Sequence, residues 1–283
     1  MINECIFGDC RESIDKMKEE GITVQTCITS PPYYGLRDYG HDGQLGLEQT
    51  PEEYIENMVG VFRKVKEVLA DDGTLWVNIG DSYYNYRPGN LSYPKQSIAS
   101  NNQDLPAISA KRNTKLAGYK EKDLIGIPWM LAFALRADGW YLRQDIIWSK
   151  PNPMPESVKD RCTKSHEYIF LLSKNQNYYF NADAIKEPSV DGNGRRKRSV
   201  WEVQLKPYKG AHFATYPTDL ILPCILASSR PGDVVFDPFF GSGTTGYVAE
   251  RTGRRWIACE LNNDYKHLQD QRLGRTGLHN FLE

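Results

Sequence analysis

A short polar and aromatic segment follows an apolar run, and it could hold a flat group that carries an amine. The run Val24–Ile28 predicts a buried strand, and after one threonine it leads into Ser30, Pro31, Pro32 and Tyr33, called the SPPY segment below. Proline fixes φ and lacks an N–H donor, so this segment is rigid and its carbonyl oxygens are available as acceptors. A hydroxyl, carbonyl oxygens and a ring face together suit an aromatic amine.

A glycine-rich turn much later in the chain has the features of a nucleoside-cofactor site. The run Val234–Phe236 predicts a strand, and a helix is expected from Thr244. Glycines let a ligand approach the backbone, and the N–H groups of a helix N-terminus attract an anion. Glu260 ends the next predicted strand, where a carboxylate can accept hydrogen bonds from ribose hydroxyls. The candidate cofactor residues here are Asp237, Pro238, Phe239, Gly241, Gly243, Thr244, Thr245 and Glu260.

Two nucleoside cofactors compete for this pattern. Gly246 supplies the third glycine of the Gly-x-Gly-x-x-Gly pattern of dinucleotide sites, which would suit a nicotinamide-dependent oxidoreductase. The aspartate and proline before the glycines are instead typical of S-adenosylmethionine sites, where the methionine carboxylate would lie against the loop and the helix start. An oxidoreductase would also leave the SPPY segment unexplained.

Strands that alternate with helices must position both segments. A helix is expected from Pro51, because Thr50 is a suitable N-cap and Glu53 completes a capping box, and it is expected to end at Asp71-Asp72-Gly73. Further helices are expected at about 128–137, 218–228, 244–251 and from about 263, and strands at 4–7, 24–29, 74–79, 140–148, 167–173, 234–236 and 256–260. This alternation predicts an α/β fold, with a mostly parallel sheet and helices on both faces.

Two long irregular segments interrupt the alternation. Residues 82–122 are rich in Asn, Ser, Tyr, Pro and Lys, and a loop of this length is usually functional or disordered. Residues 183–211 contain the basic run of residues 195–198. Such a run is either a solvated face or a local phosphate-binding patch. Residues 1–283 as a whole are expected to form one domain with these two insertions.

Composition narrows the class of protein. The formal net charge of −1 gives no global nucleic-acid signature. No apolar run reaches the length of a membrane span, and the N-terminus lacks the features of a signal peptide, so a cytoplasmic protein is expected. The cysteines are scattered, without pairs or histidine clusters at zinc spacing, so neither a metal nor a disulfide is expected. Cys27, Cys224 and Cys259 lie in apolar surroundings and are expected to be buried thiols.

With both segments in view, the chain resembles the permuted, β-class amino-group DNA methyltransferases over nearly its whole length. In that family the catalytic tetrapeptide precedes the cofactor loop, as residues 30–33 precede residues 237–245 here. Further matching blocks are Gly8-Asp9, Trp148–Pro151, His166–Tyr168 and His212–Pro217. The resemblance implies a Rossmann-like, S-adenosylmethionine-dependent methyltransferase fold. It adds three expected cofactor-binding residues, Asp9, Thr215 and Pro217.

The resemblance also implies the reaction, which is methyl transfer to the exocyclic amine of a base flipped out of double-stranded DNA. Ser30 and the Pro31 carbonyl would accept the amine hydrogens, and Tyr33 would stack on the base. Together with Pro32, these are the expected catalytic residues. In this family serine at the first position is associated with cytosine, and aspartate or asparagine with adenine. The N4 amine of cytosine is therefore the expected target, and the N6 amine of adenine is the alternative.

The irregular segments are the expected DNA contacts. The family places its recognition segment between its middle blocks and the block before the cofactor helix, which here leaves residues 183–211. The expected DNA-binding residues are Arg37, Arg195, Arg196, Lys197 and Arg198. So short a recognition segment leaves a homodimer open, and a companion restriction endonuclease is also left open. The remaining alternatives are a methyltransferase of RNA or of protein glutamine, and a catalytically silent DNA-binding relative.

Overall fold

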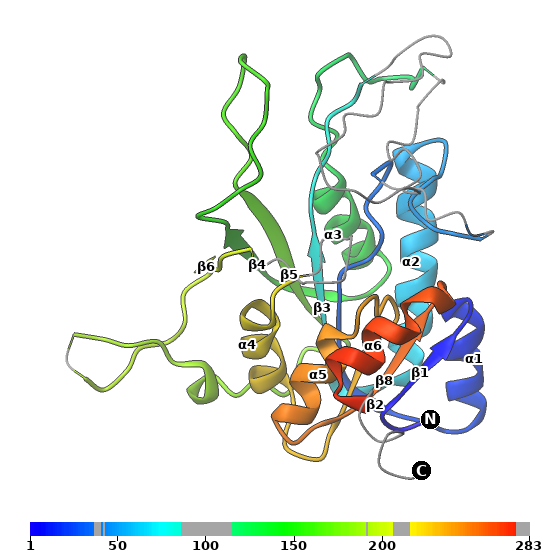
Figure 1. Cartoon of the computed structure of the whole chain (residues 1–283), viewed down its shortest axis with the longest axis vertical. Coiled ribbons are helices and arrows are strands. Elements are labelled where there is room, and N and C mark those ends of the chain that lie inside the picture. Colours follow the sequence, from blue (N-terminus) through cyan, green and yellow to red (C-terminus); the bar gives the residue numbers. More distant parts are fainter. Residues whose placement is uncertain (37–40, 42, 86–114, 191, 206–215, 276–283) are drawn as a thin grey trace, which may run out of the picture.

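An eight-stranded sheet forms the centre of the computed structural model, which describes residues 1–36, 41, 43–85, 115–190, 192–205 and 216–275 (Figure 1). The strands are β1 (Glu4–Phe7), β2 (Val24–Thr29), β3 (Leu69–Ile79), β4 (Tyr141–Ser149), β5 (His166–Ser173), β6 (Val200–Glu202), β7 (Val234–Asp237) and β8 (Arg255–Glu260). Their order across the sheet is β1-β8-β7-β2-β3-β5-β4-β6. Neighbours pair in parallel except at β5, which is antiparallel to β3 and β4. The predicted mostly parallel sheet is therefore confirmed.

Helices cover both faces of this sheet, as predicted (Figure 1). They are α1 (Cys10–Glu19), α2 (Pro51–Val68), α3 (Ile127–Ala137), α4 (Thr218–Ser228), α5 (Thr244–Arg251) and α6 (Lys266–Arg272), with 3₁₀ turns η1 (Asp183–Ile185) and η2 (Asn263–Tyr265). Helices α1, α2 and α3 pack on one face, and α4 and α5 pack on the other.

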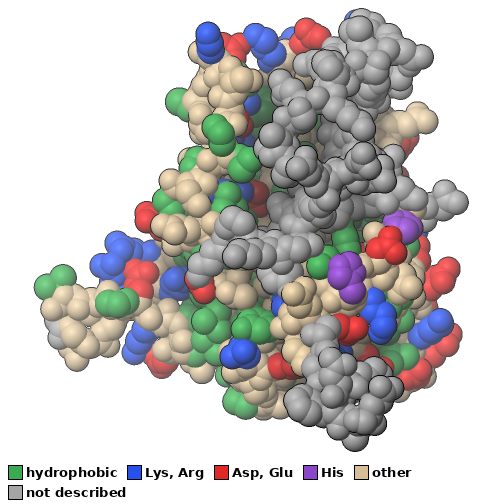
Figure 2. Space-filling view, in the orientation of Figure 1, with side chains coloured by type: hydrophobic (Ala, Val, Ile, Leu, Met, Phe, Trp, Pro, Cys, Tyr) green, Lys and Arg blue, Asp and Glu red, His purple; other side chains and the backbone are tan. Residues whose placement is uncertain are grey.

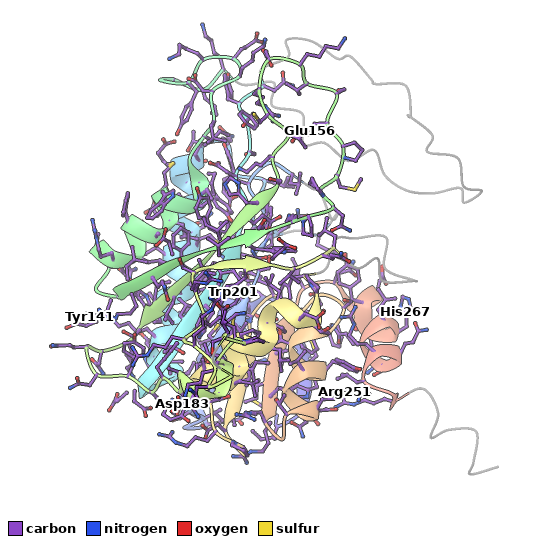
Figure 3. The ribbon with its side chains drawn as sticks, turned by 90° about the vertical axis from the view of Figure 1, so that its left-hand side faces the viewer. Tyr141, Glu156, Asp183, Trp201, Arg251 and His267 are labelled. Carbon is purple, nitrogen blue, oxygen red and sulfur yellow. The ribbon has the colours of Figure 1, made fainter. Side chains whose placement is uncertain are left out.

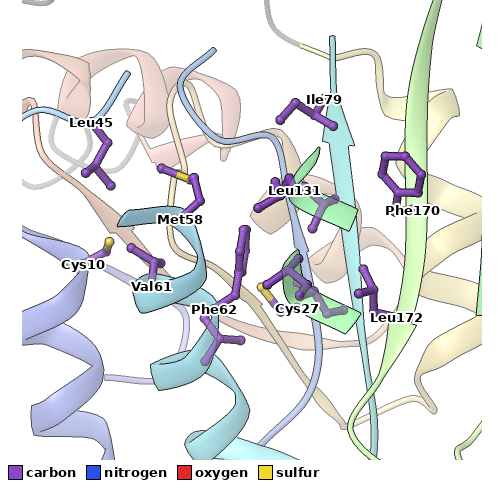
Figure 4. Packing of buried hydrophobic residues seen from close by; sticks show 14 of the residues in the cluster. Cys10, Cys27, Leu45, Met58, Val61, Phe62, Ile79, Leu131, Phe170 and Leu172 are labelled. Carbon is purple, nitrogen blue, oxygen red and sulfur yellow. The ribbon is translucent and has the colours of Figure 1, made fainter. Parts of the chain in front are cut away.

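Two hydrophobic cores result from this layering. Strand side chains alternate between the faces, so Leu75 belongs to the core under α2 and Trp76 to the core under α4. Figure 4 shows the first core, in which Phe62 of α2 lies beside Cys27 of β2 and near Leu131 of α3. Packing on both faces holds the central strands rigidly, so the loops at their ends start from fixed positions.

The start of α2 is confirmed at the level of its hydrogen bonds. The Thr50 hydroxyl accepts from the Glu53 N–H at 3.1 Å, and the Glu53 carboxylate accepts from the Thr50 N–H at 3.3 Å. This reciprocal capping box satisfies two N–H groups that the helix itself leaves unpaired. Pro51 occupies the first turn, where its missing N–H costs nothing.

The end of α2 differs from the prediction. The helix stops at Val68 and β3 begins at once at Leu69, so the Asp71-Asp72-Gly73 stretch lies within a strand. The pairing of β3 with β2 shifts register between Val24 and Thr26, which accommodates this stretch as an irregularity. A Cβ on Gly73 would lie 2.8 Å from two backbone oxygens, so glycine is required there by close packing.

Two elements lie where the sequence analysis placed none. Helix α1 begins directly after Asp9, whose carboxylate caps it by accepting from the Arg11 N–H at 2.8 Å. Strand β6 lies inside the segment 183–211 that was expected to be irregular, and it pairs in parallel with the end of β4. Only one of its three residues, Trp201, is buried, so the strand carries almost no local sequence signal.

Most of the first insertion, residues 86–114, lies outside the described residues. The part that the structure describes is tied down by a bridge between Tyr83 and Leu124 and by Asp81, which accepts from the Gly126 N–H at the start of α3. The three cysteines expected in the interior are buried. No helix within the described ranges has the length and apolar character needed to cross a membrane.

Candidate active site

The sheet brings the chemically interesting residues to one edge. Strands β1, β8, β7 and β2 run parallel, so the residues that follow them, among them Asp9, Pro238 and Ser30, lie at the same edge. The connections after β7 and β2 use α5 and α2, which cover opposite faces. A crevice opens at such a switch point, outside the carboxyl ends of the strands.

One cavity occupies this crevice and joins the two predicted sites. All four residues of the SPPY segment line it. Its wall also contains six of the expected cofactor residues, namely Asp9, Pro238, Phe239, Gly241, Thr244 and Glu260. Two segments separated by some two hundred positions in the sequence thus face the same space.

The SPPY segment presents only part of its polar surface to the cavity. The Pro32 carbonyl accepts from the Tyr54 hydroxyl at 2.9 Å, and the Tyr33 carbonyl accepts from the Leu36 N–H at 3.2 Å. Within the described part of the chain, no donor bonds to the Pro31 carbonyl. The Pro31 carbonyl therefore remains available to a ligand as a backbone acceptor.

A polar network holds the ring of Tyr33. Its hydroxyl donates to Glu167 Oε2 at 2.5 Å, and the Asn78 side chain donates to the same oxygen at 3.1 Å. The other carboxylate oxygen of Glu167 pairs with the ammonium of Lys150. Burial and the neighbouring Glu167 charge raise the pKa of Tyr33 well above its ordinary value, so its hydroxyl stays protonated and acts as a donor.

Asp237 braces the cofactor loop from behind the cavity wall. One carboxylate oxygen accepts from the Thr29 hydroxyl at 2.6 Å and the Phe239 N–H at 3.0 Å. The other accepts from the Thr245 hydroxyl at 2.5 Å and the Tyr216 hydroxyl at 3.0 Å. Burial raises the pKa of Asp237, and these hydrogen bonds oppose that effect. The side chain therefore ties β7 to β2 and to α5, and it does not line the cavity.

Two carboxylates line the cofactor half of the cavity. Glu260 accepts from the Gly241 N–H at 2.7 Å and from the Asn262 N–H at 2.9 Å, which fixes the glycine turn, and burial raises its pKa. Asp9 forms an ion pair and hydrogen bonds with Arg11. The hydrogen bonds lower the pKa of Asp9, whereas burial by itself would raise it. Glu260 has one donor on each oxygen and keeps lone pairs that can accept from a ligand hydroxyl, whereas both oxygens of Asp9 already accept from Arg11.

The other expected cofactor residues do not line the cavity or lie outside the described residues. Gly243, with φ of +88°, is the N-cap of α5, and Pro217 is the N-cap of α4. Neither these residues nor Thr245 lines the cavity, whereas Tyr216 from the same block as Pro217 does. Thr215 lies outside the described residues.

The cavity wall also contains residues that had been given no role by the sequence analysis, among them Asn78, Lys150, Glu167 and Tyr216. The last three belong to sequence blocks that carried the family resemblance. The sequence therefore marked these positions but did not indicate what their side chains do. Asn78 carried no signal, because a polar residue within a strand shows its purpose only when the neighbouring strand is known.

Four of the five expected DNA-binding residues, those at positions 195–198, lie on a projecting arm, residues 183–199 (Figures 1 and 2). Arg195 and Arg198 both pair with Glu187, at 2.9 and 2.8 Å, and Lys197 lies over the Trp201 ring. Arg37 lies outside the described residues. A second projection, the loop between β4 and β5 that carries Glu156, extends away from Asp183 in Figure 3.

Comparison with known proteins decides the family. A family profile described as a DNA methylase of the N6/N4 type matches residues 24–271. The chain belongs to this family. The type II methyltransferase M.Cfr9I of Citrobacter freundii is 52% identical over 251 residues, which cover 89% of this chain and 81% of that protein. The type II methyltransferase M.SmaI of Serratia marcescens is 48% identical over 272 residues, covering 95% and 90%. This chain is accordingly a DNA methyltransferase.

Solved structures of methyltransferases share the fold of this family member. The PvuII DNA methyltransferase, described as cytosine-N4-specific, matches with a TM-score of 0.65 at 21% identity, covering 95% of this chain and 85% of that one. A putative DNA modification methylase of Thermus thermophilus, in complex with S-adenosyl-L-methionine, matches with a TM-score of 0.62 at 22% identity, covering 95% and 92%. The expected Rossmann-like methyltransferase fold is confirmed.

The methyl donor of this family, S-adenosylmethionine, fits the residues of the cavity. The Ser242 hydroxyl lies buried on the wall without a hydrogen-bond partner among the described residues, beside the N-terminus of α5. Such a donor and the helix start suit the methionine carboxylate, while Glu260 suits the ribose hydroxyls. Phe239 and Leu261 supply apolar surface. The cofactor is therefore S-adenosylmethionine.

Proposed function

We propose that this enzyme methylates the N4 amine of cytosine in double-stranded DNA, at a specific site and on a base flipped out of the helix. The observation that carries the proposal is the shared cavity, in which the SPPY segment and the cofactor loop face one another. A base amine at one wall would then lie next to the methyl donor at the other. Positioning of this kind supplies a large part of the rate acceleration of a two-substrate reaction.

The SPPY segment can activate a poor nucleophile. The lone pair of an aromatic amine is delocalised into the ring, so the nitrogen must become tetrahedral before it attacks. The Ser30 hydroxyl and the Pro31 carbonyl accept the amine hydrogens and favour that geometry. When bound, S-adenosylmethionine supplies an electrophilic methyl group, so the residues of this chain mainly align the amine and exclude water.

The requirement for base flipping follows from access. An exocyclic amine paired inside a duplex cannot reach the cavity, so the base must leave the stack. We assign to Tyr33 the stacking surface for that base, a contact worth on the order of 1–3 kcal/mol. The bond from Tyr33 to Glu167 keeps the ring from rotating away, which supports this role.

Cytosine is favoured over adenine by the first residue of the segment. Ser30 both donates and accepts, so it can accept an amine hydrogen and also donate to the adjacent ring nitrogen, which is an acceptor in cytosine. The same bonds are open to adenine, whose N6 amine lies beside the acceptor N1, so the preference for cytosine rests on the association of serine with cytosine in this family. Methylation of adenine N6 is the alternative that the experiment below must distinguish.

The recognition of DNA is assigned to the arm and its surroundings. We propose that residues 183–211, with the basic run 195–198, contact phosphates or base edges, that the insertion 82–122 contributes, and that Arg37 clamps a phosphate near the flipped base. We further propose that residues 1–283 form a single catalytic domain of a cytoplasmic enzyme, that the enzyme can form a homodimer, and that a restriction endonuclease of the same site accompanies it.

Product analysis tests the proposal. DNA from a host that expresses the enzyme is digested to nucleosides and analysed by mass spectrometry, and N4-methylcytosine should appear only with the active chain. N6-methyladenine as the sole product would replace cytosine by adenine as the target. Transfer of labelled methyl to RNA or protein, with none to DNA, would contradict the proposal altogether.

A further inference from the structure

A half-buried ion pair, formed by Lys150 and Glu167, lines the cavity beside the SPPY segment. Lys150 directly follows β4 and Glu167 lies in β5, and the register of these two strands places Trp148 opposite Glu167. The Lys150 N–H donates to the Ser165 carbonyl at 2.8 Å, which extends the pairing past the end of the strand. The two side chains are only 14% and 15% exposed. The sheet therefore fixes where this ammonium group lies.

Glu167 connects Lys150 to Tyr33, because it binds each of them through a different carboxylate oxygen. One of its oxygens accepts from Tyr33 and Asn78, and the other accepts from Lys150. Oε2 already has two donors and Oε1 has one, so most of the acceptor capacity of Glu167 is used within the protein. Its effect is to hold the Lys150 ammonium and the Tyr33 ring in a constant relation to each other.

Lys150 itself retains donor capacity. An ammonium group has three N–H donors. Among the described residues, the acceptor that it reaches is Glu167 Oε1, and its nitrogen also lies 4.3 Å from the centre of the Trp148 ring. Lys150 lines the cavity, so its further donors are available to a ligand there. A buried donor that meets no acceptor when the cavity fills would be costly.

We propose that Lys150 makes the pocket selective for cytosine by donating a hydrogen bond to the ring carbonyl oxygen, O2. The inference rests on the function proposed above, and it names the group that reads the base. With its amine at Ser30 and the Pro31 carbonyl, a cytosine presents N3 and then O2 along one ring edge. Adenine presents a ring nitrogen and then a C–H group at the corresponding place. Adenine would therefore leave the Lys150 donor without an acceptor.

A substrate analogue without O2 tests this contact. After the methylated site has been read from the DNA of an expressing host, duplexes are made with either cytosine or a 2-aminopyridine C-nucleoside at the target position. The analogue keeps the amine and the ring nitrogen but lacks O2. The ratio of kcat/KM for the two duplexes is measured at alkaline pH for the wild type, for Lys150→Met and for a control, Lys164→Met. Lys164 is close enough to Glu167 to interact with its charge but does not line the cavity.

We expect the wild type and Lys164→Met to lose roughly tenfold to hundredfold in kcat/KM when O2 is absent. Lys150→Met should show a similar loss on cytosine and no further loss on the analogue. If Lys150 only supported Glu167 and Tyr33, the variant would be slower on both duplexes and would keep the wild-type ratio, which would overturn the proposal.

The proposal can still be tested if Lys150→Met folds poorly. Cofactor binding by calorimetry reports on folding, and Lys150→Gln, which keeps an N–H donor, should retain part of the dependence on O2. A wild-type enzyme that is indifferent to O2 refutes the proposal without any variant. Failure of the proposed function would show earlier, as N6-methyladenine in the product analysis of the wild type.

Discussion

Two residues of the active site illustrate how similar sequence signals lead to different roles. Ser30 and Asp237 each follow an apolar strand and each belongs to a family motif. Ser30 lines the cavity, where its hydroxyl can meet a substrate. Asp237 is buried behind the wall, and its carboxylate accepts four hydrogen bonds from protein groups. We therefore expect Ser30 to affect turnover, and Asp237 to affect the shape of the cofactor loop.

Ser30→Ala should lower kcat by roughly a hundredfold to a thousandfold, as is typical when one preorganised hydrogen-bond partner of the reacting group is removed. Its dissociation constant for S-adenosylmethionine should stay the same, because the cofactor loop is untouched. Single-turnover kinetics and calorimetry measure the two quantities. An unchanged kcat would remove Ser30 from the proposed mechanism.

Asp237→Ala should both destabilise the protein and weaken cofactor binding. The substitution removes the carboxylate that three hydroxyls and one N–H share, although the Tyr216 and Thr245 hydroxyls can still bond each other. We expect a cost of about 2–4 kcal/mol in the free energy of unfolding. The loop that carries Pro238 and Phe239 would then lose its brace. Denaturant unfolding and calorimetry measure both effects, and Asp71→Ala is the control, since that side chain is 92% exposed. Tight cofactor binding in a destabilised variant would show that the brace is not needed by the site.

At the scale of elements, the antiparallel strand β5 completes the site. It lies between β3 and β4 and enters the sheet from the same edge at which those two strands end. Its first residues, including Glu167, therefore meet Asn78 near the end of β3 and Lys150 after β4. In a parallel strand at this position the first residues would lie at the far edge, so a glutamate at the place of Glu167 would lie away from Tyr33.

The close contact of Gly80 with this cluster leads to a prediction. A Cβ at position 80 would lie 2.8 Å from Tyr33 Cε2 and 3.3 Å from Glu167 Cγ. Gly80→Ala should therefore displace the Tyr33 ring and reduce kcat by about a hundredfold, while cofactor affinity is retained. The control is Gly60→Ala on the surface of α2, where a Cβ meets nothing within 4 Å.

The control has an expected outcome of its own. Alanine should raise the free energy of unfolding by about 0.5–1 kcal/mol at position 60, because glycine is a poor helix former, and it should leave turnover unchanged. Equal turnover in Gly80→Ala and the wild type would mean that the position of the Tyr33 ring does not control the reaction.

At the scale of the whole molecule, binding of DNA depends on where charge lies. The net charge of −1 cannot attract a polyanion, whereas the arm concentrates basic side chains near a projecting turn. Part of this charge is already used, since Glu187 pairs with both Arg195 and Arg198. Arg196 forms no ion pair with any described residue, so we expect it to contribute most to phosphate binding.

Neutralising Arg196 and Lys197 should weaken binding and flatten its dependence on salt. The slope of log K against log salt should decrease by about 0.9 for each phosphate contact that is removed. Fluorescence anisotropy with a labelled duplex over a range of salt concentrations measures the slope. Lys16→Gln on α1, which lies across the sheet from the arm in Figure 1, should leave it unchanged. A slope that stays constant in the double variant would mark the run as a solvated face.

Local signals in the sequence were sufficient for elements whose cause is local. The capping box at Thr50 and the glycine turn before Thr244 each satisfy nearby backbone groups, and both helices begin where expected. Strand β6 and the early start of β3 depend on pairing with distant strands, so no local pattern indicated them. For the same reason the roles of Asn78 and Lys150 were missed.

The order and chemistry of the motifs by themselves determined the family, the α/β class and the cofactor, because each motif is a contiguous segment whose residues serve a single ligand group. The three-dimensional fold decided which residues of those motifs face the cavity and which support it from behind. It also brought Glu167 and Lys150 to Tyr33. Hydrogen bonds between strands join residues that are far apart in the chain, and their partners exist only once the sheet has formed.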